Sequence, residues 1–315
     1  MRVTLLHNPK AGDESHGRAW LEGLLAGIGW QADYHSTKEE GWEAALDAAA
    51  SAAAAGGGTE AVVVAGGDGT VRKAALRLAG SGVPLAMLPM GTANNLATAL
   101  QGAPGEAEAV VTGWRRPRRR SLDVWRVEGP GGTVRAIESV GLGLLARVMG
   151  HRVADELESV DEARGFVRRW LEGQRAVPWR LEADGRALEG RWLLAEAMNI
   201  PCIGPNLCLA HGADGADGRL DLVLLEESAR HRLVAMLAPA GAATSNGSTP
   251  AFHALRVSEL RATCDLADLH VDDEPHPAEL GRGSSATGEV SIVVTRDPAG
   301  SVEFLLPRPG LAGPV

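Results

Sequence analysis

The sequence predicts an α/β protein in which a domain built on a parallel sheet is followed by a domain of antiparallel strands. Three observations lead to this fold class. Apolar runs alternate with helical patterns over the first hundred residues, as they do in successive βαβ units. Near residue 118 the pattern changes to short strand-like runs. The length of 315 residues is enough for about two domains, each with its own core.

The N-terminal part contains apolar runs that predict strands and periodic runs that predict helices. The run AVVVA at 61–65 has no polar residue, which is typical of a strand buried on both faces of a sheet. The predicted strands occupy residues 3–6, 61–65 and 84–88, and the predicted helices occupy residues 15–28, 42–55, 71–78 and 94–100. We therefore expect residues 1–120 to form an α/β domain.

The remainder, residues 121–299, shows the pattern of an antiparallel sheet or sandwich. The Gly-Pro-Gly-Gly sequence at 129–132 predicts a hairpin turn. The predicted strands occupy residues 122–127, 133–140, 191–198, 220–225, 254–260, 269–272 and 289–295, and the predicted helices occupy residues 155–171 and 229–237. The polar segment 242–250 is expected to be a loop.

Composition and charge exclude several classes of function. The 31 basic and 40 acidic residues give a net charge of −9, which argues against a nucleic-acid-binding protein. No apolar run reaches the ~18 residues needed to span a bilayer, and the N-terminal apolar stretch is too short for a signal peptide. We expect a cytoplasmic protein, with peripheral contact at the inner membrane surface left open. The three cysteines predict buried thiols, because their number and spacing suit neither a disulfide scaffold nor a zinc site.

Three polar or glycine-rich loops follow predicted strands: NPKAG at 8–12, GGDGT at 66–70 and GTANN at 91–95. Ligands of open α/β sheets bind at the carboxyl ends of the strands, where these loops are expected to meet. Glycines let the backbone approach a ligand, and helix N-termini attract anions. The loops therefore predict a nucleotide pocket, although no Walker A sequence is present.

In this order and spacing, the three motifs resemble the diacylglycerol kinase catalytic family, which includes sphingosine kinases and bacterial soluble lipid kinases. NAD kinases and phosphofructokinases share the GGDG-type loop but not the whole set. Farther along, DGADGRLD at 214–221 resembles the family's DDG-x-L-D segment, VDDEP at 271–275 its DGE motif, and VEFLLP at 302–307 its closing strand. The resemblance implies a three-layer α/β nucleotide-binding domain of the NAD kinase and diacylglycerol kinase type. It also implies that residues 300–315 return to that domain.

The resemblance further implies an ATP-dependent lipid kinase that uses Mg²⁺ and phosphorylates a hydroxyl of a diacylglycerol-like or sphingoid lipid. Glu274 would be the general base, and Asp68 would act near the transferred phosphate, either through Mg²⁺ or directly. A structural Mg²⁺ would be held by Asp217 and by main-chain oxygens near Asp214 and Arg219. The residues expected to contact ATP are Asn8, Pro9, Lys10, Ala11, Gly12, Thr37, Gly66, Gly67, Asp68, Gly69, Thr70, Thr92 and Asn94.

Three positions depart from the family's pattern. Asn95 stands at the aspartate of GTxND, Asp273 at the glycine of DGE, and Ala216 at the first aspartate of DDG. Asp tolerates a left-handed backbone, so the turn at Asp273 is expected to survive. Two alternatives to the lipid kinase stay open. One is a kinase of a soluble acceptor such as NAD, and the other is a nucleotide- or lipid-binding protein that has lost catalysis.

Some features of the sequence have both a structural and a functional interpretation. Five arginines lie within 115–120, next to Trp114, and they predict either a solvated linker between domains or a peripheral membrane contact. The apolar segment 142–149 suits a core as well as an acyl chain. The same two interpretations apply to four tryptophans, Trp125, Trp170, Trp179 and Trp192. The sequence does not indicate the oligomeric state.

Overall fold

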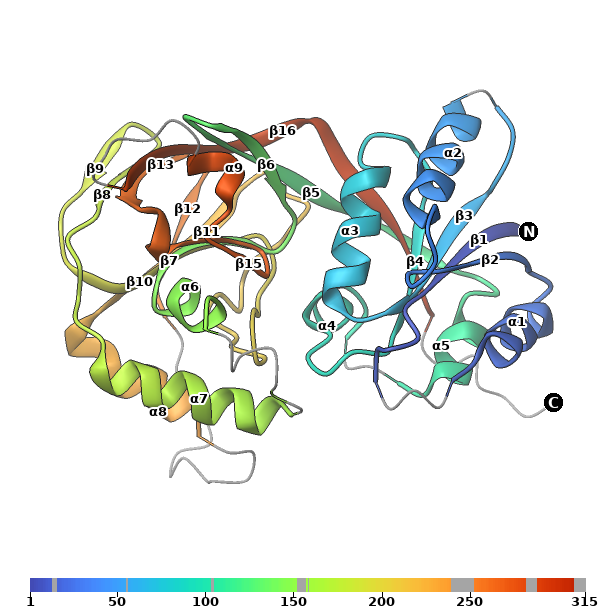
Figure 1. Cartoon of the computed structure of the whole chain (residues 1–315), viewed down its shortest axis with the longest axis horizontal. Helices are drawn as coiled ribbons and strands as arrows, with labels where there is room; N and C mark the ends of the chain where they lie inside the picture. Colours follow the sequence, from blue (N-terminus) through green and yellow to red (C-terminus); the bar gives the residue numbers. More distant parts are fainter. Residues whose placement is uncertain are drawn as a thin grey trace. The chain divides into compact units, whose positions relative to one another are not determined.

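The computed structural model describes residues 1–12, 16–54, 56–102, 105–151, 157, 159–238, 252–281 and 288–308. It divides into two compact units (Figure 1). Unit 1 comprises Met1–Val124 and Ala299–Val315, and unit 2 comprises Trp125–Pro298. Unit 1 is an α/β domain and unit 2 is built on antiparallel strands, so the predicted fold class is confirmed.

The sheet of unit 1 is parallel. Its strands follow the order β2 (Gln31–Ser36), β1 (Arg2–His7), β3 (Ala61–Gly66) and β4 (Leu85–Pro89). The end of β16 (Glu289–Leu306) lies parallel to β4, with Phe304 opposite Leu85. Every residue of β3 is buried, as the continuous apolar run predicts.

Helices cover both faces of this sheet, which gives three layers (Figure 1). Helix α1 (Arg18–Gly27) and helix α5 (Ala107–Gly113) pack on one face in a common apolar core. On the other face, α2 (Trp42–Ala54) contacts β1 and α3 (Asp68–Leu78) contacts β3. Helix α3 buries its residues at positions 71, 74, 75 and 78, the spacing of one helix face. Helix α4 (Asn95–Gln101) contacts α3.

Unit 2 contains two sheets with an apolar core between them. One sheet has the antiparallel order β12 (Ala254–Val257), β11 (Leu220–Glu226), β10 (Trp192–Met198), β7 (Ser139–Gly143), β14 (Leu269–Val271) and β15 (Glu274–Pro275). The other contains β16, β13 (Leu260–Asp265), β8 (Arg180–Ala183) and β9 (Arg186–Leu188), with β5 (Arg118–Gly129) pairing with β16 and with β6 (Gly132–Ala136).

The helices of unit 2 include three that form a second apolar core with the six-stranded sheet. These are α6 (Leu144–Met149), α7 (Val160–Gly173) and α8 (Arg230–Met236). Helix α7 begins after Ser159, whose hydroxyl accepts the N–H of Glu162, the usual arrangement of a helix cap. The remaining elements are α9 (Ala278–Gly281), η2 (Glu227–Ala229) and η3 (Leu266–Asp268). None of the helices within the described ranges combines the length and the apolar character needed to cross a bilayer.

Some predicted elements differ from the structure. The single strand expected at 254–260 is two strands, β12 and β13, separated by Ser258 and Glu259. The run expected at 133–140 is likewise divided between β6 and β7. The predicted hairpin at 129–132 is confirmed, since β5 and β6 pair there with Gly129 opposite Gly132. The segment 242–250, expected to be a loop, lies outside the described residues.

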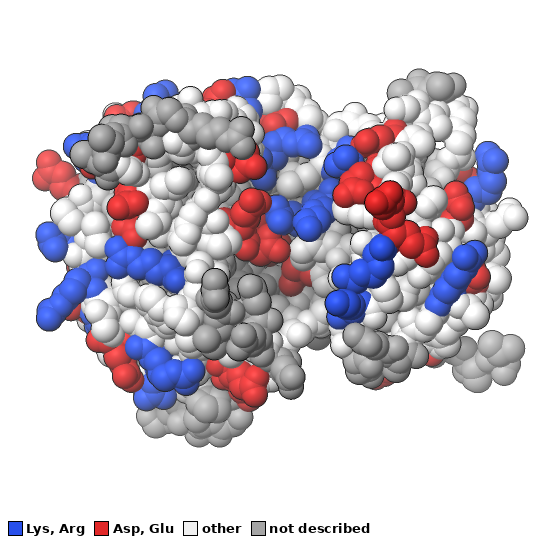
Figure 2. All heavy atoms as spheres, viewed as in Figure 1, with Lys and Arg blue, Asp and Glu red and all other residues white. Residues whose placement is uncertain are grey.

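The arginine run lies in unit 1, shortly before the boundary with unit 2 at Val124, and most of its side chains are exposed. Residues 118–120 begin β5, and Arg119 forms an ion pair with Glu303. The guanidinium of Arg115 donates to the carbonyl of Gly27 at 2.7 Å. Trp114 is 1% exposed and stacks on Trp30, so its ring is not available for contact with a membrane. Figure 2 shows acidic and basic side chains distributed together over the visible face.

The residues with two open interpretations are largely core residues. Trp125, Trp179 and Trp192 lie in the core between the two sheets of unit 2, and Trp170 is half-buried against the core formed with the helices. The segment 142–149 forms the end of β7 and the whole of α6, and most of its side chains are buried. This arrangement favours the structural interpretation for these residues.

The expectation of three buried thiols is wrong for two of them, because Cys202 and Cys208 form a disulfide. Cys264 is free and buried, and burial raises the pKa of its thiol to about 12, with the nearby charge of Asp268 adding to the effect. The sequence spacing did not reveal the disulfide, because the chain between the two cysteines returns on itself through the Ile203–Leu207 bridge.

We expect the folded, non-reduced protein to show no rapidly reacting thiol towards a disulfide reagent, because the Cys264 thiolate is scarce and inaccessible. In guanidinium chloride, one thiol per chain should react, rising to three after reduction. Counting thiols spectrophotometrically under the three conditions checks this. Three reactive thiols in denaturant without reduction would contradict the disulfide.

Candidate functional site

The three loops of the predicted nucleotide pocket start from adjacent strands at one edge of the sheet of unit 1. Main-chain hydrogen bonds tie them together there. The N–H of Asn8 donates to Ala65 of β3 at 2.9 Å, and the N–H of Met90 donates to Gly66 at 3.0 Å. Thr37, after β2, donates its N–H to His7 at 2.8 Å. The structure therefore brings together the loops that begin at Asn8, Thr37, Gly66 and Met90.

Glycines allow two of the loops to touch. A Cβ on Gly91 would lie 2.6 Å from Cα of Gly67, and a Cβ on Gly67 would lie 3.2 Å from Cα of Gly91. Gly12 has a φ of 74°, and a Cβ there would lie 2.7 Å from the carbonyl oxygen of Met90. At these positions a side chain would force the loops apart, so the glycines serve close backbone approach.

Asn8 connects the first loop to the second. Its side-chain amide donates to the hydroxyl of Thr70 at 3.3 Å, while its Oδ1 accepts the N–H of Lys10 at 3.2 Å. The hydroxyl oxygen of Thr37 is buried and has no hydrogen-bond partner among the residues that the structure describes. Lys10 and Thr92 are exposed.

Asp68 holds the beginning of α4. Its two carboxylate oxygens accept the N–H groups of Asn95 at 2.9 Å and Leu96 at 3.0 Å. An acidic group at a helix N-terminus both satisfies these donors and complements the helix dipole. Asn94 stands just before the helix with a φ of 49°, and its amide group bonds to both the N–H and the carbonyl of Gly91. Asp68 thus connects the second and third loops.

Glu274 lies in unit 2, at the start of β15, and its side chain is exposed. The hairpin between β14 and β15 pairs Glu274 with Val271. The left-handed residue of this turn is Asp272, with a φ of 52°, rather than Asp273 as the sequence suggested. The buried carboxylate of Asp272 accepts the N–H groups of residues 137–139, with shortest distances of 2.7 to 3.0 Å. Asp272 therefore holds the hairpin against the start of β7.

The buried pair of His270 and Glu196 was not predicted from the sequence. His270 and Glu196 are fully buried, and His270 Nε2 lies 3.0 Å from Glu196 Oε1. Their strands lie on either side of β7, and Gly141 stands between them in register. A Cβ on Gly141 would lie 2.1 Å from Glu196 Oε2, so a glycine is required there. An acidic residue inside the apolar run WLLAEAM was the sequence signal that could have indicated this pair.

The segment expected to hold a structural metal is exposed at Asp214, Asp217 and Arg219. Asp217 Oδ1 accepts the N–H of Arg219 at 2.9 Å, and Asp217 Oδ2 forms an ion pair with Arg256. Asp214 Oδ1 accepts the N–H of Ala216 at 3.2 Å. Within the described part of the chain, no three His, Cys, Asp or Glu side chains are grouped so that they could hold a metal ion.

Comparison with known proteins bears on the three loops. Residues 2–127 match the family model described as "Diacylglycerol kinase catalytic domain". The predicted resemblance to this family is confirmed. The match includes all three loops of the diacylglycerol kinase-like region, and it ends before Glu274 and the 214–221 segment. This match supports the prediction that the chain is a kinase.

Similar proteins extend the comparison over more of the chain. A diacylglycerol kinase from Mycobacterium tuberculosis is 27% identical over 238 residues, which cover 68% of this chain and 71% of that protein. The crystal structure of a diacylglycerol kinase from Bacillus anthracis has a TM-score of 0.64 and 17% identity, covering 99% of this chain and 98% of that one. Yeast NADH kinase has a TM-score of 0.53 and 11% identity, covering 99% of this chain and 85% of that one. The two structures show a shared fold.

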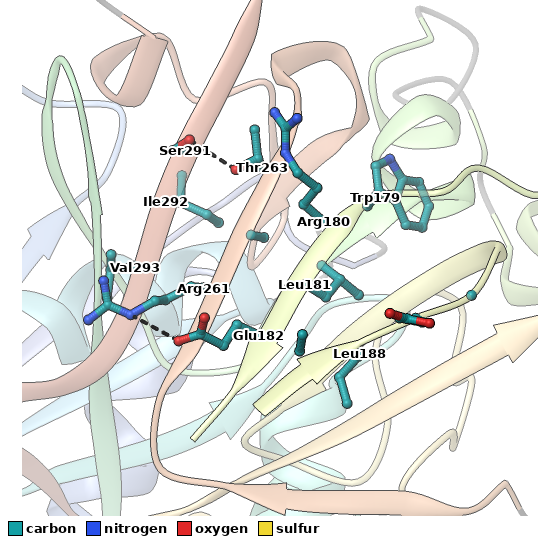
Figure 3. Close-up of a pocket in the computed structure, with 14 residues that line it drawn as sticks. Trp179, Arg180, Leu181, Glu182, Leu188, Arg261, Thr263, Ser291, Ile292 and Val293 are labelled. Atoms are coloured by element: carbon teal, nitrogen blue, oxygen red, sulfur yellow. Dashed lines mark hydrogen bonds and ion pairs between the residues drawn. The ribbon is translucent and has the colours of Figure 1, made fainter. Parts of the chain in front are cut away.

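A hollow of about 610 Å³ on unit 2 is lined by none of the predicted site residues (Figure 3). It is formed on β8, β9, β13 and β16. Figure 3 shows that Arg261 and Glu182 pair across it, as do Thr263 and Ser291. The hollow is a sheet surface with its own cross-strand pairs, and it carries none of the chemistry expected of the site.

Proposed function

We propose that this chain is an ATP-dependent lipid kinase that transfers the γ-phosphoryl group of ATP to a hydroxyl of a diacylglycerol-like or sphingoid lipid, with Mg²⁺. The observation that carries the proposal is the bonded set of three loops at one sheet edge, within the residues that match the diacylglycerol kinase catalytic domain. Residues 1–120 and 300–315 would bind ATP, and residues 121–299 would bind the acceptor.

The loops supply what phosphoryl transfer requires of a protein, which is position and charge neutralisation. Gly67 and Gly91 are in close contact and have no side chains, so this edge of the sheet presents backbone. Backbone N–H groups there can donate hydrogen bonds to phosphate oxygens. In this proposal, ATP is contacted by residues 8–12, residues 66–70, Thr37, Thr92 and Asn94. The buried hydroxyl oxygen of Thr37 has no hydrogen-bond partner among the described residues.

Mg²⁺ in such sites is bound mainly by the substrate's phosphates and by one or two carboxylates. We propose Asp68 for this role, because its carboxylate lies in the GGDGT loop next to the third loop, where it accepts the N–H groups of Asn95 and Leu96. The ion would neutralise charge on the phosphates. Asn95, where the family has an aspartate, offers an amide in place of a second carboxylate.

The lipid hydroxyl is a weak nucleophile, so a carboxylate base is needed to take its proton. We propose Glu274 for this role. Its side chain is exposed, so a substrate can reach the carboxylate. The hairpin that carries it is fixed in place because the carboxylate of Asp272 accepts main-chain N–H groups of residues 138 and 139.

The test of the proposal is transfer of ³²P from γ-labelled ATP into a mixed lipid extract with Mg²⁺ and detergent, run beside a reaction with NAD. A labelled lipid supports the proposal, and its mobility identifies the acceptor. Label in NAD would favour the soluble-acceptor kinase, whose fold yeast NADH kinase shares. ATP binding without any labelled product would favour a binding protein that has lost catalysis.

The two roles of Asp68 can be separated by comparing Asp68→Asn with Asp68→Ala. The Ala variant loses the cap of α4, which is worth about 1 kcal/mol and lowers Tm by roughly 2–4 °C. The Asn variant keeps one accepting oxygen and should retain most of this stability. Both should lose phosphoryl transfer, because both lack the negative charge.

Labelled-product assays and thermal unfolding measure the two effects. Asp265→Ala serves as the matched control, since Asp265 caps η3 by accepting the N–H of Ala267. It should lower Tm without reducing activity. Near wild-type activity in Asp68→Asn would assign Asp68 a purely structural role.

A further inference from the structure

The turn before β11 has one carboxylate in the place where the resemblance to the kinase family implies a structural metal. The side chain of Asp217 is 25% exposed, and both of its oxygens are already bonded. One accepts the N–H of Arg219 at 2.9 Å, and the other forms an ion pair with the guanidinium of Arg256. The position opposite the carboxylate is therefore occupied by a cation that belongs to the chain itself.

The strand register explains why Arg256 reaches this turn. Arg256 lies on β12, where it stands directly opposite Asp221 of β11. Asp221 is four residues after Asp217, and from this register position the guanidinium of Arg256 forms its ion pair with Asp217. A second guanidinium, that of Arg296, lies 3.9 Å from the position that a Cβ on Gly218 would take. Positive charge thus approaches the turn from two strands, β12 and β16.

The residues present do not fit a magnesium ion. Mg²⁺ requires oxygen ligands in near-octahedral geometry, with one or two carboxylates among them. Ala216 has replaced one family carboxylate, and Asp217 is paired with Arg256. A guanidinium stays charged at any ordinary pH, so it repels a divalent cation from the oxygen that it binds.

We propose that Arg256 takes the place of the structural metal ion at this turn. Its guanidinium neutralises Asp217 and connects the turn to β12, and the turn is folded without a divalent cation. Two consequences follow. The protein as it stands has no structural metal here, and removing the Arg256 charge makes Asp217 accessible to one.

The experiment uses Mn²⁺ alone, without ATP, followed by electron paramagnetic resonance, together with thermal unfolding in EDTA or in MgCl₂. It compares the full-length wild-type chain with Arg256→Gln, and with Arg261→Gln as the matched control. Arg261 also pairs with a carboxylate at the surface of unit 2, at 2.7 Å from Glu259, and its side chain is exposed to a similar extent. Asp217→Asn is added to wild type and to Arg256→Gln, to separate this turn from any other cation site.

The wild-type protein should have the same Tm in EDTA and in MgCl₂, and Asp217→Asn should not change its Mn²⁺ binding. Arg256→Gln should bind Mn²⁺ at least about tenfold more tightly than wild type and gain Tm in MgCl₂, and Asp217→Asn should abolish both gains. The control should behave as wild type. The proposal is overturned if wild type binds one Mn²⁺ that Asp217→Asn removes, or if Arg256→Gln gains no more than Arg261→Gln.

Discussion

Replacing Glu274 by Gln should lower the turnover of phosphoryl transfer by about 10²- to 10⁴-fold and leave the affinity for ATP unchanged. Gln has nearly the same shape as Glu but cannot accept a proton from the lipid hydroxyl. The ATP affinity should not change, because the proposed ATP contacts all lie in loops of unit 1, whereas Glu274 belongs to a hairpin of unit 2. The expected signature is therefore a change in kcat without a change in nucleotide binding.

Steady-state assays with the identified acceptor give kcat, and a fluorescent ATP analogue gives nucleotide affinity. Glu279→Gln is the matched control, since Glu279 is another exposed carboxylate of the same unit, on α9. It should keep full activity. If Glu274→Gln turns over within about twofold of wild type, the general base must be another group.

The elements predicted correctly are those whose own segment of sequence has a clear helical or apolar pattern. The Ala-rich helix expected at 42–55 is α2, and the apolar run at 61–65 is β3. Strand β2 escaped prediction because it is an edge strand with a mixed polar sequence, QADYHS. The hairpin of β8 and β9 was also missed, although its turn residues, Asp184 and Gly185, both have the positive φ that favours this dipeptide. That signal was present in the sequence.

The positions of the loops in the proposed site could be predicted from the sequence, but the contacts that hold the site together could not. The three loops followed from the rule that parallel strands end at one edge, and the structure does bring them together. The attachment of Asp68 to the start of α4 could not be inferred, because it depends on how two loops 27 residues apart approach each other. The role of Asp272 in holding the hairpin also depends on contacts with residues more than 130 positions away.

The second large effect concerns the buried pair of His270 and Glu196. Nδ1 of His270 lies 2.9 Å from the carbonyl oxygen of Asp272, which can only accept, so this nitrogen carries a proton. Nε2 faces the Glu196 carboxylate, which also accepts. Both nitrogens donate in the charged form of the imidazole. Burial by itself lowers the pKa of His270, but the charge and hydrogen bond of Glu196 and the carbonyl of Asp272 outweigh it and raise the pKa.

Glu196→Gln should therefore destabilise the protein by about 3 kcal/mol near pH 5.5, or roughly 6–12 °C in Tm. In the variant, burial is left as the main influence and lowers the pKa of His270, so protonation opposes folding. In wild type the raised pKa gives stability that is complete below about pH 6.5 and is lost as the pH rises through the folded-state value. The difference between wild type and variant should decrease with rising pH.

Thermal and urea unfolding between pH 5.5 and 8.5 measure this dependence. Asp33→Asn is the control, because Asp33 pairs with His35 at 3.3 Å in an exposed position. An exposed pair is worth at most about 1 kcal/mol, so the control should show little change at any pH. Equal stability of Glu196→Gln and wild type at every pH would mean that the pair carries no charge. Because His270 also donates to the main chain of Asp272, the charge of this pair contributes to holding the hairpin that presents Glu274.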